Sequence, residues 1–195
     1  MEYDSFAFGK IKENPKEWLI LGLVMMLLSS IPLLSFVVIM NAQRAIIRYL
    51  EGKGEIPTIN DLLNTDHATD FIIGGLLAGI AISSGIMLCF IGIYATIVLF
   101  FFGQYLIADG LFSPVDGLKA SFYYAKDNIG PIIIFILIES ILMTIWGTLA
   151  LLTCGLGYLV LMPMLNIVMC KFYIEHKEGI LAAAQKNAVP LLVKK

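Results

Sequence analysis

The sequence predicts an all-α fold, a polytopic membrane helix bundle, and three observations support this prediction. The stretch from Phe71 to Ala108 contains no Asp, Glu, Lys, Arg or His. One crossing helix needs roughly 20 apolar residues, so a run of about twice that length holds two crossings, or one crossing and a buried return. The chain is 59% hydrophobic and only 14% charged, whereas soluble domains are about a quarter charged. Two further long apolar runs flank the central one.

The three apolar runs are interpreted as three helical hairpins, which gives six membrane helices in a single transmembrane domain over residues 1–195. Polar loops separate the hairpins, and a basic tail follows the last one. The alternative is five membrane helices plus one amphipathic helix on the membrane surface. In order along the chain, the hairpins, loops and tail occupy about residues 16–50, 51–70, 71–108, 109–128, 130–174 and 175–195.

The first apolar run leaves both interpretations open. Asn14 followed by proline favours a helix start, because proline at the first helical position lacks only an N–H that would be unpaired anyway. Trp18 is then placed as an anchor at the membrane interface. A turn that ends at Pro32 makes this run a hairpin. Without that turn, residues 18–40 form one kinked crossing and residues 41–51 form the surface helix.

The central run is expected to turn back near Gly92. A turn there leaves arms from Phe71 to Leu88 and from Ile93 to Ala108. At about 1.5 Å per residue, each arm is just long enough to cross a hydrocarbon layer of roughly 30 Å. The turn must be tight, since each unpaired backbone amide in lipid costs several kcal/mol.

Small residues on the first arm of this hairpin predict a helix-packing surface. Gly75 and Gly79 are four positions apart, and Gly85 continues the pattern. Small residues at such spacing let a second helix approach closely. The surface serves either packing within the chain or contact with a second copy of it.

The two polar loops contain signals for short helices. In the first loop, Thr58 and Asn60 are candidate caps of a short helix that ends near Asn64. In the second loop, Ser113 is a candidate N-cap, followed by a proline at the first helical position. Residues 115–124 then place apolar and aromatic side chains on one face, as expected of a helix that lies in the membrane interface.

The third apolar run is expected to turn back at Gly155 and Gly157, because glycine adopts left-handed backbone angles at little cost. Pro163 lies in the returning arm, where its missing N–H kinks the helix and leaves a carbonyl near residue 159 without its usual partner. The run contains a single charged residue, Glu139. We therefore expect a hairpin with a kinked second helix and one acidic group inside the membrane.

The 13 Lys and Arg residues avoid all three predicted turns. Basic residues concentrate on the cytoplasmic side of membrane proteins, so both termini and the long loops are expected in the cytoplasm, with the chain in the inner membrane of the cell. In the five-helix alternative, only the N-terminal segment changes sides. The basic residues lie within residues 1–17, 44–53, 119–126 and 171–195.

A loose set of motifs gives the chain a resemblance to known proteins. These motifs are Ile107–Ser121, Asn128–Gly130, Gly155–Gly157, Pro163 and Phe172–Tyr173. From about Asn14 to Tyr173, the chain resembles a broad group of uncharacterised prokaryotic multi-pass membrane proteins, which includes the membrane domain ahead of the catalytic domain in some glycerophosphodiester phosphodiesterases. The resemblance implies a six-helix bundle with cytoplasmic ends. The phosphodiesterase chemistry is not carried over, because the group shares no agreed activity and that catalytic domain is not among these residues.

Glu139 is the residue that most directly suggests chemistry. An ionised carboxylate near the middle of a membrane costs several kcal/mol unless it is paired or hydrogen-bonded, so burial favours the neutral acid. We expect Glu139 to form an intramembrane polar site with Asn166 and Gln104 on neighbouring helices. Such a site either carries a proton or cation, or joins helices as a polar clasp. Further candidate partners are Ser83, Ser84, Tyr94 and Thr96.

No motif predicts a metal, a cofactor or an enzyme. His67 and His176 lie far apart without ligand spacing, and the three cysteines have no CxxC spacing. The sequence has no phosphate-binding loop and no arrangement of nucleophile and base. A net charge of -2, without a basic cluster, argues against a nucleic-acid partner.

The sequence therefore predicts a non-enzymatic accessory or scaffold protein of the membrane. The expected partners are membrane lipid, a partner membrane protein or a second copy of the chain, held in grooves between the helices. The alternative function is a small transporter or a substrate-capturing transport subunit, with Glu139 as its proton or cation site.

Overall fold

The computed structural model describes residues 2–86 and 89–192, including the side chains of all of these outside 84–91. Within these residues every regular element is a helix, and no strand occurs. Three of the helices are long and apolar enough to cross a membrane: α3 (Pro32–Leu50), α9 (Ile129–Leu152) and α10 (Tyr158–Lys186). The all-α prediction is confirmed, and these three candidate spans agree with the membrane class.

The chain divides into two compact units, and α9 and α10 each contribute to both. The first unit contains Met1–Asp66 and Glu139–Glu175, and the second contains His67–Ile138 and His176–Lys195. Each unit is described by itself below.

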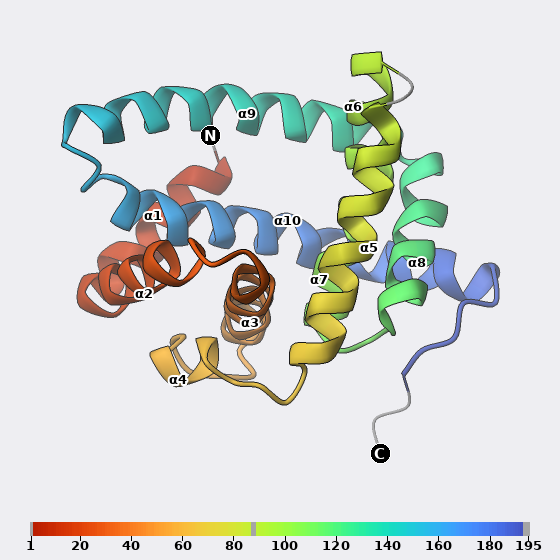
Figure 1. The fold of residues 1–195 in the computed structure, drawn as a ribbon, viewed down its shortest axis with the longest axis horizontal. Helices are drawn as coiled ribbons and strands as arrows, with labels where there is room; N and C mark the ends of the chain where they lie inside the picture. Colours follow the sequence, from red (N-terminus) through yellow and green to blue (C-terminus); the bar gives the residue numbers. More distant parts are fainter. Residues whose placement is uncertain (1, 87–88, 193–195) are drawn as a thin grey trace. The chain divides into compact units, whose positions relative to one another are not determined.

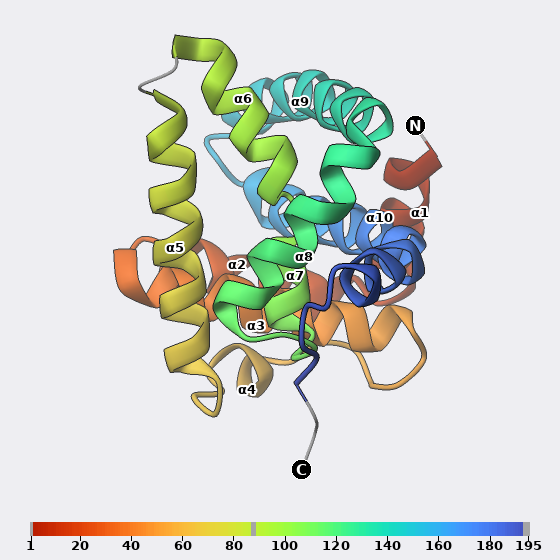
Figure 2. The same ribbon diagram turned by 90° about the vertical axis from the view of Figure 1, so that its right-hand side faces the viewer.

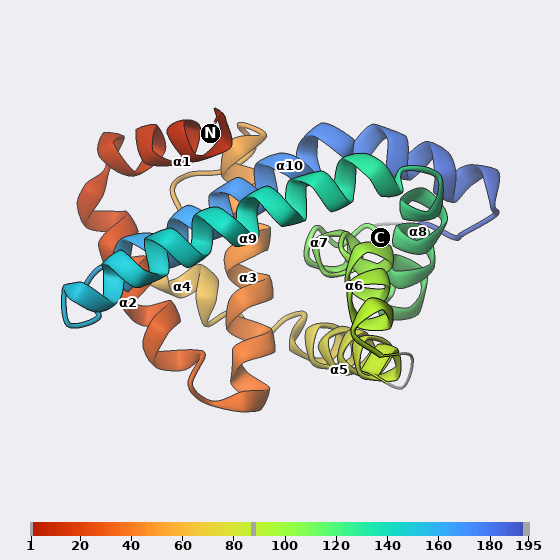
Figure 3. The same cartoon turned by 90° about the horizontal axis from the view of Figure 1, so that it is seen from above.

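The first unit begins with α1 (Glu2–Glu13), α2 (Pro15–Leu28), α3 and the short α4 (Ile59–Leu62). The chain turns back between α2 and α3, with Pro32 at the first helical position of α3 (Figure 3). The prediction of a turn ending at Pro32 is therefore confirmed, and the alternative of one helix through residues 18–40 is wrong. The reason is local, because proline starts a helix well but interrupts one that is already running.

The sequence predicted Trp18 as an anchor at the membrane interface, but its indole ring packs inside the first unit. Its side chain is fully buried, and its ring meets Tyr49 edge to face with the centroids 6.0 Å apart. Burial of the large apolar area of the indole stabilises the packing of α2 on the end of α3. Lys10 of α1 covers the same tyrosine, with its Nζ 5.7 Å from the ring centroid.

Pro163 lies inside α10, as predicted, and the turn before it is where α2 packs closely. Because proline has no N–H, the carbonyl of Leu159 loses its usual helical donor. Gly22 of α2 lies directly against this carbonyl, and a Cβ added to Gly22 would overlap it and reach Pro163 Cδ at 3.1 Å. The close approach of α2 to α10 therefore requires glycine at position 22.

The loop that follows α3 is held by its cap and by a buried amide. Thr58 and Asp61 form a reciprocal capping box at the start of α4, which confirms the predicted cap. The Asn41 side chain, buried in α3, donates to the backbone carbonyls of Leu62 at 3.1 Å and Asn64 at 2.6 Å. These bonds fix the end of α4 against α3.

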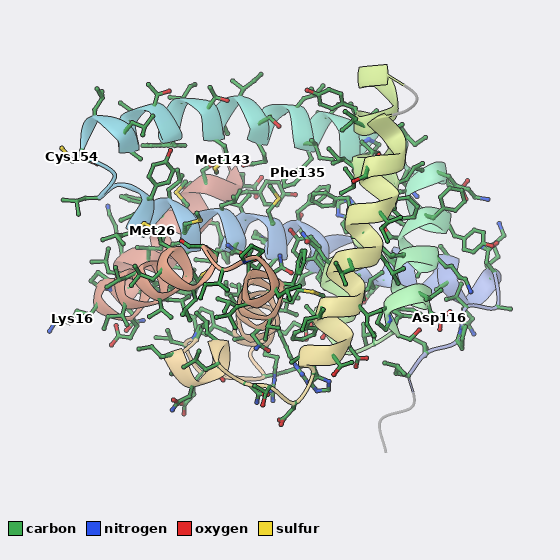
Figure 4. The ribbon with its side chains drawn as sticks, viewed as in Figure 1. Lys16, Met26, Asp116, Phe135, Met143 and Cys154 are labelled. Carbon is green, nitrogen blue, oxygen red and sulfur yellow. The ribbon has the colours of Figure 1, made fainter. Side chains whose placement is uncertain are left out.

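The turn between α9 and α10 spans residues 153–157, where the sequence predicted it. Cys154 and Gly155 have φ angles of 54° and 85°, so the predicted left-handed backbone is confirmed at Gly155. Gly157 has another reason to be glycine, because a Cβ there would lie 2.7 Å from the Cα of Ala150. The side chain of Cys154 points away from the helices at the outer end of this turn (Figure 4).

The second unit contains α5 (Ala68–Ile86), α6 (Cys89–Phe100), α7 (Gly103–Ala108) and α8 (Pro114–Asp127). α6 turns back alongside α5, and α8 packs against α7 (Figure 2). The prediction that Gly92 lies in the turn is wrong, because α6 already begins at Cys89 and Gly92 is part of that helix. Apolar side chains cannot form hydrogen bonds with the backbone. Helix formation close to the turn therefore pairs N–H and C=O groups that would otherwise lack partners in lipid.

The returning arm, predicted as one helix from Ile93 to Ala108, is broken between α6 and α7. The hydroxyl of Ser121 on α8 bridges the break: it donates to the carbonyl of Leu99 at 2.9 Å and accepts from the N–H of Phe102 at 3.1 Å. Ser121 is fully buried, and it supplies the hydrogen bonds that a continuous helix would have made.

The predicted helix-packing surface of α5 is shifted in the structure. A Cβ on Gly79 would meet no described atom within 4 Å, whereas a Cβ on Gly74 would lie 2.9 Å from Ile107 of α7. Packing within the chain therefore uses Gly74, one position before Gly75, and the prediction for Gly79 is wrong in this respect. Gly85 is among the residues whose side-chain surroundings lie outside the description. Contact of this surface with a second copy stays a prediction.

The connector between α7 and α8 follows the sequence closely. Ser113 accepts a hydrogen bond from the N–H of Asp116 and precedes a proline, which confirms the predicted N-cap. Asp109 pairs with Lys177 of α10 at 2.6 Å. On α8, Leu118 is buried while Phe122 is 37% exposed, so the apolar residues predicted to share one face divide between the core and the surface.

Candidate functional site

A groove of about 410 Å³ lies in the first unit, between α1 and the end of the α9–α10 hairpin. A volume of this size falls in the range of small-molecule and cofactor sites, roughly 300–1,000 Å³. Its lining is almost entirely apolar, with one acidic residue and a few hydroxyl groups. The lining residues are Asp4, Ser5 and Phe8 of α1, Trp146, Leu149, Ala150 and Thr153 of α9 and the turn, and Gly157, Val160, Leu161 and Met164 of the turn and α10.

Contacts near the N-terminal end of α1 fix this helix beside α10 (Figure 1). The hydroxyl of Tyr3 donates to the Glu175 carboxylate at 2.5 Å, and its ring packs edge to face on Phe172 with the centroids 6.0 Å apart. Lys171 lies 4.7 Å from the centroid of the Phe6 ring, which adds a cation–π contact. Partial burial and the hydrogen bond to Glu175 raise the pKa of Tyr3.

The sequence of α1 divides its surface between packing and groove. Ala7 and Ile11 are buried and lie four residues apart, on one face of the helix. Phe8 is 47% exposed and lines the groove. Asp4 also lines it, and both oxygens of its carboxylate are buried. α1 therefore brings one aromatic ring and one acid to the site.

α9 has an inverted distribution of polarity. Ile134 and Ile141 are 59% and 62% exposed, while Glu139, the only charged residue of the helix, is 2% exposed. This pattern is typical of a helix whose apolar surface faces lipid and whose polar residue faces protein. Glu139 is one turn before Met143, whose side chain lies on the side of α9 that faces α10 (Figure 4).

The carboxyl group of Glu139 has an acidic neighbour that the sequence did not predict. It interacts electrostatically with Asp4 of α1. Its Oε2 atom has no hydrogen-bond partner among the described residues. The interaction connects α1 with α9 inside the first unit, beside the groove that Asp4 lines.

Asn166 and Gln104, the two predicted partners of Glu139, belong to different units of the chain. Asn166 is buried in α10, and its amide donates to the carbonyl of Met162 in its own helix at 3.0 Å. Its clasp with Glu139 stays a prediction. A short amide side chain reaches the preceding turn of its own helix more easily than another helix. Gln104 lies in α7 of the second unit, so its part in the polar site stays a prediction.

The remaining predicted partners also lie in the second unit. Thr96 donates to carbonyls of its own helix, at 3.0 Å to Gly92 and 2.9 Å to Ile93. Tyr94 is 59% exposed and lines a wholly apolar groove of about 350 Å³ between α6 and the first part of α9. Ser83 is exposed, and Ser84 lies among the residues whose side chains are not described.

Sequence reasoning missed Asp4, Phe8 and Trp146 as site residues. The signal available was the alternation of acidic and aromatic residues in the first eight positions, which is also typical of a solvated surface helix. The proximity of Asp4 to Glu139 depends on how α1 packs within the first unit. No spacing of residues in the sequence indicates it. Of the predicted turn residues, Gly157 does line the groove.

The lining of the groove indicates which kind of ligand fits it. Apolar walls beside one acidic edge suit a ligand that is itself part apolar and part polar. Within the described residues, no group of three or more His, Cys, Asp or Glu side chains is placed to hold a metal ion. Comparison of the chain with family models, curated proteins and solved structures gave no match, so the resemblance stated above stays a prediction.

Proposed function

We propose that the chain is an integral inner-membrane protein with six membrane helices arranged as three hairpins, with its termini and long loops in the cytoplasm. The turn before Pro32, the turn at residues 153–157 and the pairing of α5 with α6 support this arrangement. The exposed apolar surface of α9 also supports it, because such a surface is stable only against lipid or another protein.

Within the membrane we propose a non-enzymatic accessory protein that binds a membrane lipid in the groove beside α1. The observation that carries this proposal is the lining of the groove, in which apolar side chains of three helices surround a space large enough for part of an acyl chain. Phe8, Trp146 and Leu149 are each more than 40% exposed there. A lipid chain covers such side chains at no cost in unpaired polar groups.

The lipid-binding proposal is tested with Leu149→Ser and a matched control, Leu152→Ser. Both residues are exposed leucines of α9, but only Leu149 lines the groove. Native mass spectrometry of the full chain in a gentle detergent should show a retained phospholipid in the wild type and in Leu152→Ser. Occupancy should fall roughly tenfold in Leu149→Ser, because loss of a leucine contact costs about 1.5 kcal/mol. Equal retention by both variants, or no lipid in the wild type, would overturn the proposal.

The second candidate function is transport coupled to a proton or cation. The specific observation in its favour is Glu139, which is buried and leaves Oε2 without a hydrogen-bond partner among the described residues. The test is proton flux into liposomes that contain the wild type or Glu139→Gln. Transport predicts a flux that the substitution abolishes while the variant still folds. An unchanged flux would remove this candidate.

A further inference from the structure

We propose that a second groove, on α8 of the second unit, binds anionic phospholipids, with Lys119 and Lys126 as the partners of the headgroup. This site is separate from the groove beside α1, and the inference shares with the proposed function only the position of the chain in a membrane. It depends on the lining of the α8 groove, the positions of the two lysines and the place of the acidic residues on the helix.

The α8 groove has a volume of about 380 Å³ and lies where α8 packs against α5 and the end of α6. Leu77 and Ala81 of α5 line it together with Val115 of α8. Two aromatic rings also line it, those of Phe100 and Phe122, which stack with their centroids 6.3 Å apart. All lining residues belong to the second unit. An acyl chain covers apolar side chains of this kind and removes them from water.

Both lysines lie on the exposed face of α8. The exposed residues of this face follow one another at spacings of four, three and four positions, which places them along one side of a helix; they are Val115, Lys119, Phe122 and Lys126. Lys119 lines the groove. Lys126 lies next to it, because its Nζ is 5.3 Å from the ring centroid of Tyr123, which is a lining residue. Apolar residues and lysines on one exposed face are typical of a helix at a membrane surface.

The charge of the groove is positive, since Lys119 is the only charged residue among the described residues that line it. Its Nζ lies 3.5 Å from Oδ1 of Asp116, and its side chain is 57% exposed. This distance is longer than that of a charge-assisted hydrogen bond, about 2.7–2.9 Å, and an exposed pair of this kind contributes little to stability. Asp116 is held at the N-cap, where its Oδ2 accepts from the Ser113 hydroxyl at 2.7 Å. Asp127, the other acid of α8, does not line the groove. The three N–H donors of the Lys119 ammonium can therefore reach a phosphate.

The charge and the apolar wall together define the class of ligand. Two ammonium groups attract a headgroup with net negative charge, and each lysine near a membrane surface strengthens such binding roughly fivefold. A zwitterionic headgroup carries its own cation, which the lysines repel. A soluble anion leaves the apolar wall uncovered. An anionic phospholipid satisfies both parts of the site, with its phosphate at the lysines and its acyl chain along α5 and α8.

The experiment is a competition between two photoreactive lipids on the full-length chain in gentle detergent. Phosphatidylglycerol and phosphatidylcholine, with the same photoreactive acyl chain, are offered together in equal amounts. Mass spectrometry of peptides then measures which lipid labels residues 77–81 and 115–123. In the wild type, phosphatidylglycerol should label these segments roughly twentyfold more than phosphatidylcholine, the product of about fivefold for each lysine.

The double variant Lys119→Gln/Lys126→Gln should lose this preference, and Lys126→Gln alone should lower it roughly fivefold. The matched control is Lys16→Gln/Lys186→Gln, which makes the same charge change on two exposed lysines outside α8. The control should keep the preference of the wild type. Should the double variant fail to fold, the wild type and Lys126→Gln decide.

The outcomes separate this inference from the proposed function, because labelling of residues 146–161 reports on the groove beside α1. Labelling there and not at α8 overturns this inference and leaves the proposed function standing, and the reverse pattern does the opposite. Equal labelling of the α8 groove by both lipids, a preference that survives in the double variant, or one that is lost equally in the control also overturns the inference. A dimer in native mass spectrometry whose α8 groove takes up no lipid would assign the groove to a second copy instead.

Discussion

Single residues determine how closely the helices of the first unit approach one another. Gly22 meets the carbonyl that Pro163 leaves without a helical donor. Tyr3 connects α1 to α10 through one short hydrogen bond to Glu175. An added methyl group at position 22, or a removed hydroxyl group at position 3, changes a contact between two helices. Both contacts can therefore be tested with conservative substitutions.

Gly22→Ala should destabilise the protein by about 1–3 kcal/mol, because the added methyl group overlaps a backbone carbonyl that cannot move freely. The measurement is the thermal unfolding midpoint in detergent, followed by tryptophan fluorescence. Gly9→Ala is the matched control, since a Cβ on Gly9 meets no described atom within 4 Å. That control should keep or raise the midpoint, because alanine favours the helix. Equal midpoints for the two variants would contradict the close contact at Gly22.

Tyr3→Phe should lower stability by roughly 0.5–1 kcal/mol at neutral pH through loss of the hydrogen bond to Glu175. The folded pKa of Tyr3 is raised above its ordinary value of 10.0. Its contribution to stability is therefore fully present below pH 10 and decreases as the pH rises toward the folded pKa. Unfolding midpoints measured between about pH 8 and about pH 11 should fall more steeply for the wild type than for Tyr3→Phe. Parallel pH profiles would show that Tyr3 titrates as an isolated tyrosine.

At the scale of elements, the break between α6 and α7 shows how a third helix stabilises an interruption. The apolar arm has the length of one helix, yet Ser121 of α8 bonds both sides of the break. The ring of Phe102, at the start of α7, stacks on His176 of α10 with the centroids 5.8 Å apart. The second unit therefore depends on contacts of α7 with α8 and α10.

Ser121→Ala should destabilise the second unit by about 1–3 kcal/mol, since it removes the hydrogen-bond partner of a partly buried carbonyl and of a buried N–H. Hydrogen exchange measured by mass spectrometry should rise in peptides that cover residues 99–108. Ser83→Ala is the control, because Ser83 is an exposed serine of α5. Unchanged exchange at the break in Ser121→Ala would mean that this hydroxyl does not hold the two helices.

In the whole molecule, the proposed topology assigns the turns and the termini to opposite sides of the membrane. The α9–α10 turn contains no basic residue, whereas the C-terminal tail is rich in lysine. The proposed topology, with the basic residues in the cytoplasm, therefore predicts that this turn lies on the opposite side of the membrane. The two described cysteines offer a direct test, because Cys154 is exposed in the turn and Cys170 is buried in α10.

A membrane-impermeant maleimide should label Cys154 only from the extracytoplasmic side, and Cys170 only after unfolding. The variant Cys89→Ser gives a simple background, and addition of Cys154→Ser to it should abolish labelling of the folded protein. Mass spectrometry then measures the labelling of the protein. Intact cells expose its extracytoplasmic side to the reagent, and inverted membrane vesicles expose its cytoplasmic side. Labelling of Cys154 from the cytoplasmic side would overturn the proposed topology.

Features encoded within a few consecutive residues were predicted well. The helix start at Pro32, the left-handed turn at Gly155 and the N-cap at Ser113 all appear in the structure. Each depends on the backbone preferences of one or two residues and needs no distant partner. Glu139 was identified as buried for a similarly simple reason, since a lone charge in an apolar helix must avoid lipid.

By itself the sequence determined that this chain is helical, that its long helices are apolar enough to cross a membrane and where two of its turns fall. Only the tertiary structure shows that Asp4 lies close enough to Glu139 to interact electrostatically, and that Gly74 and not Gly79 packs within the chain. It also shows that Ser121 bridges the break between α6 and α7. The physical reason is the range of the interactions. Hydropathy and turn preferences act between neighbouring residues, whereas these contacts join positions far apart in the chain and exist only once the helices have packed.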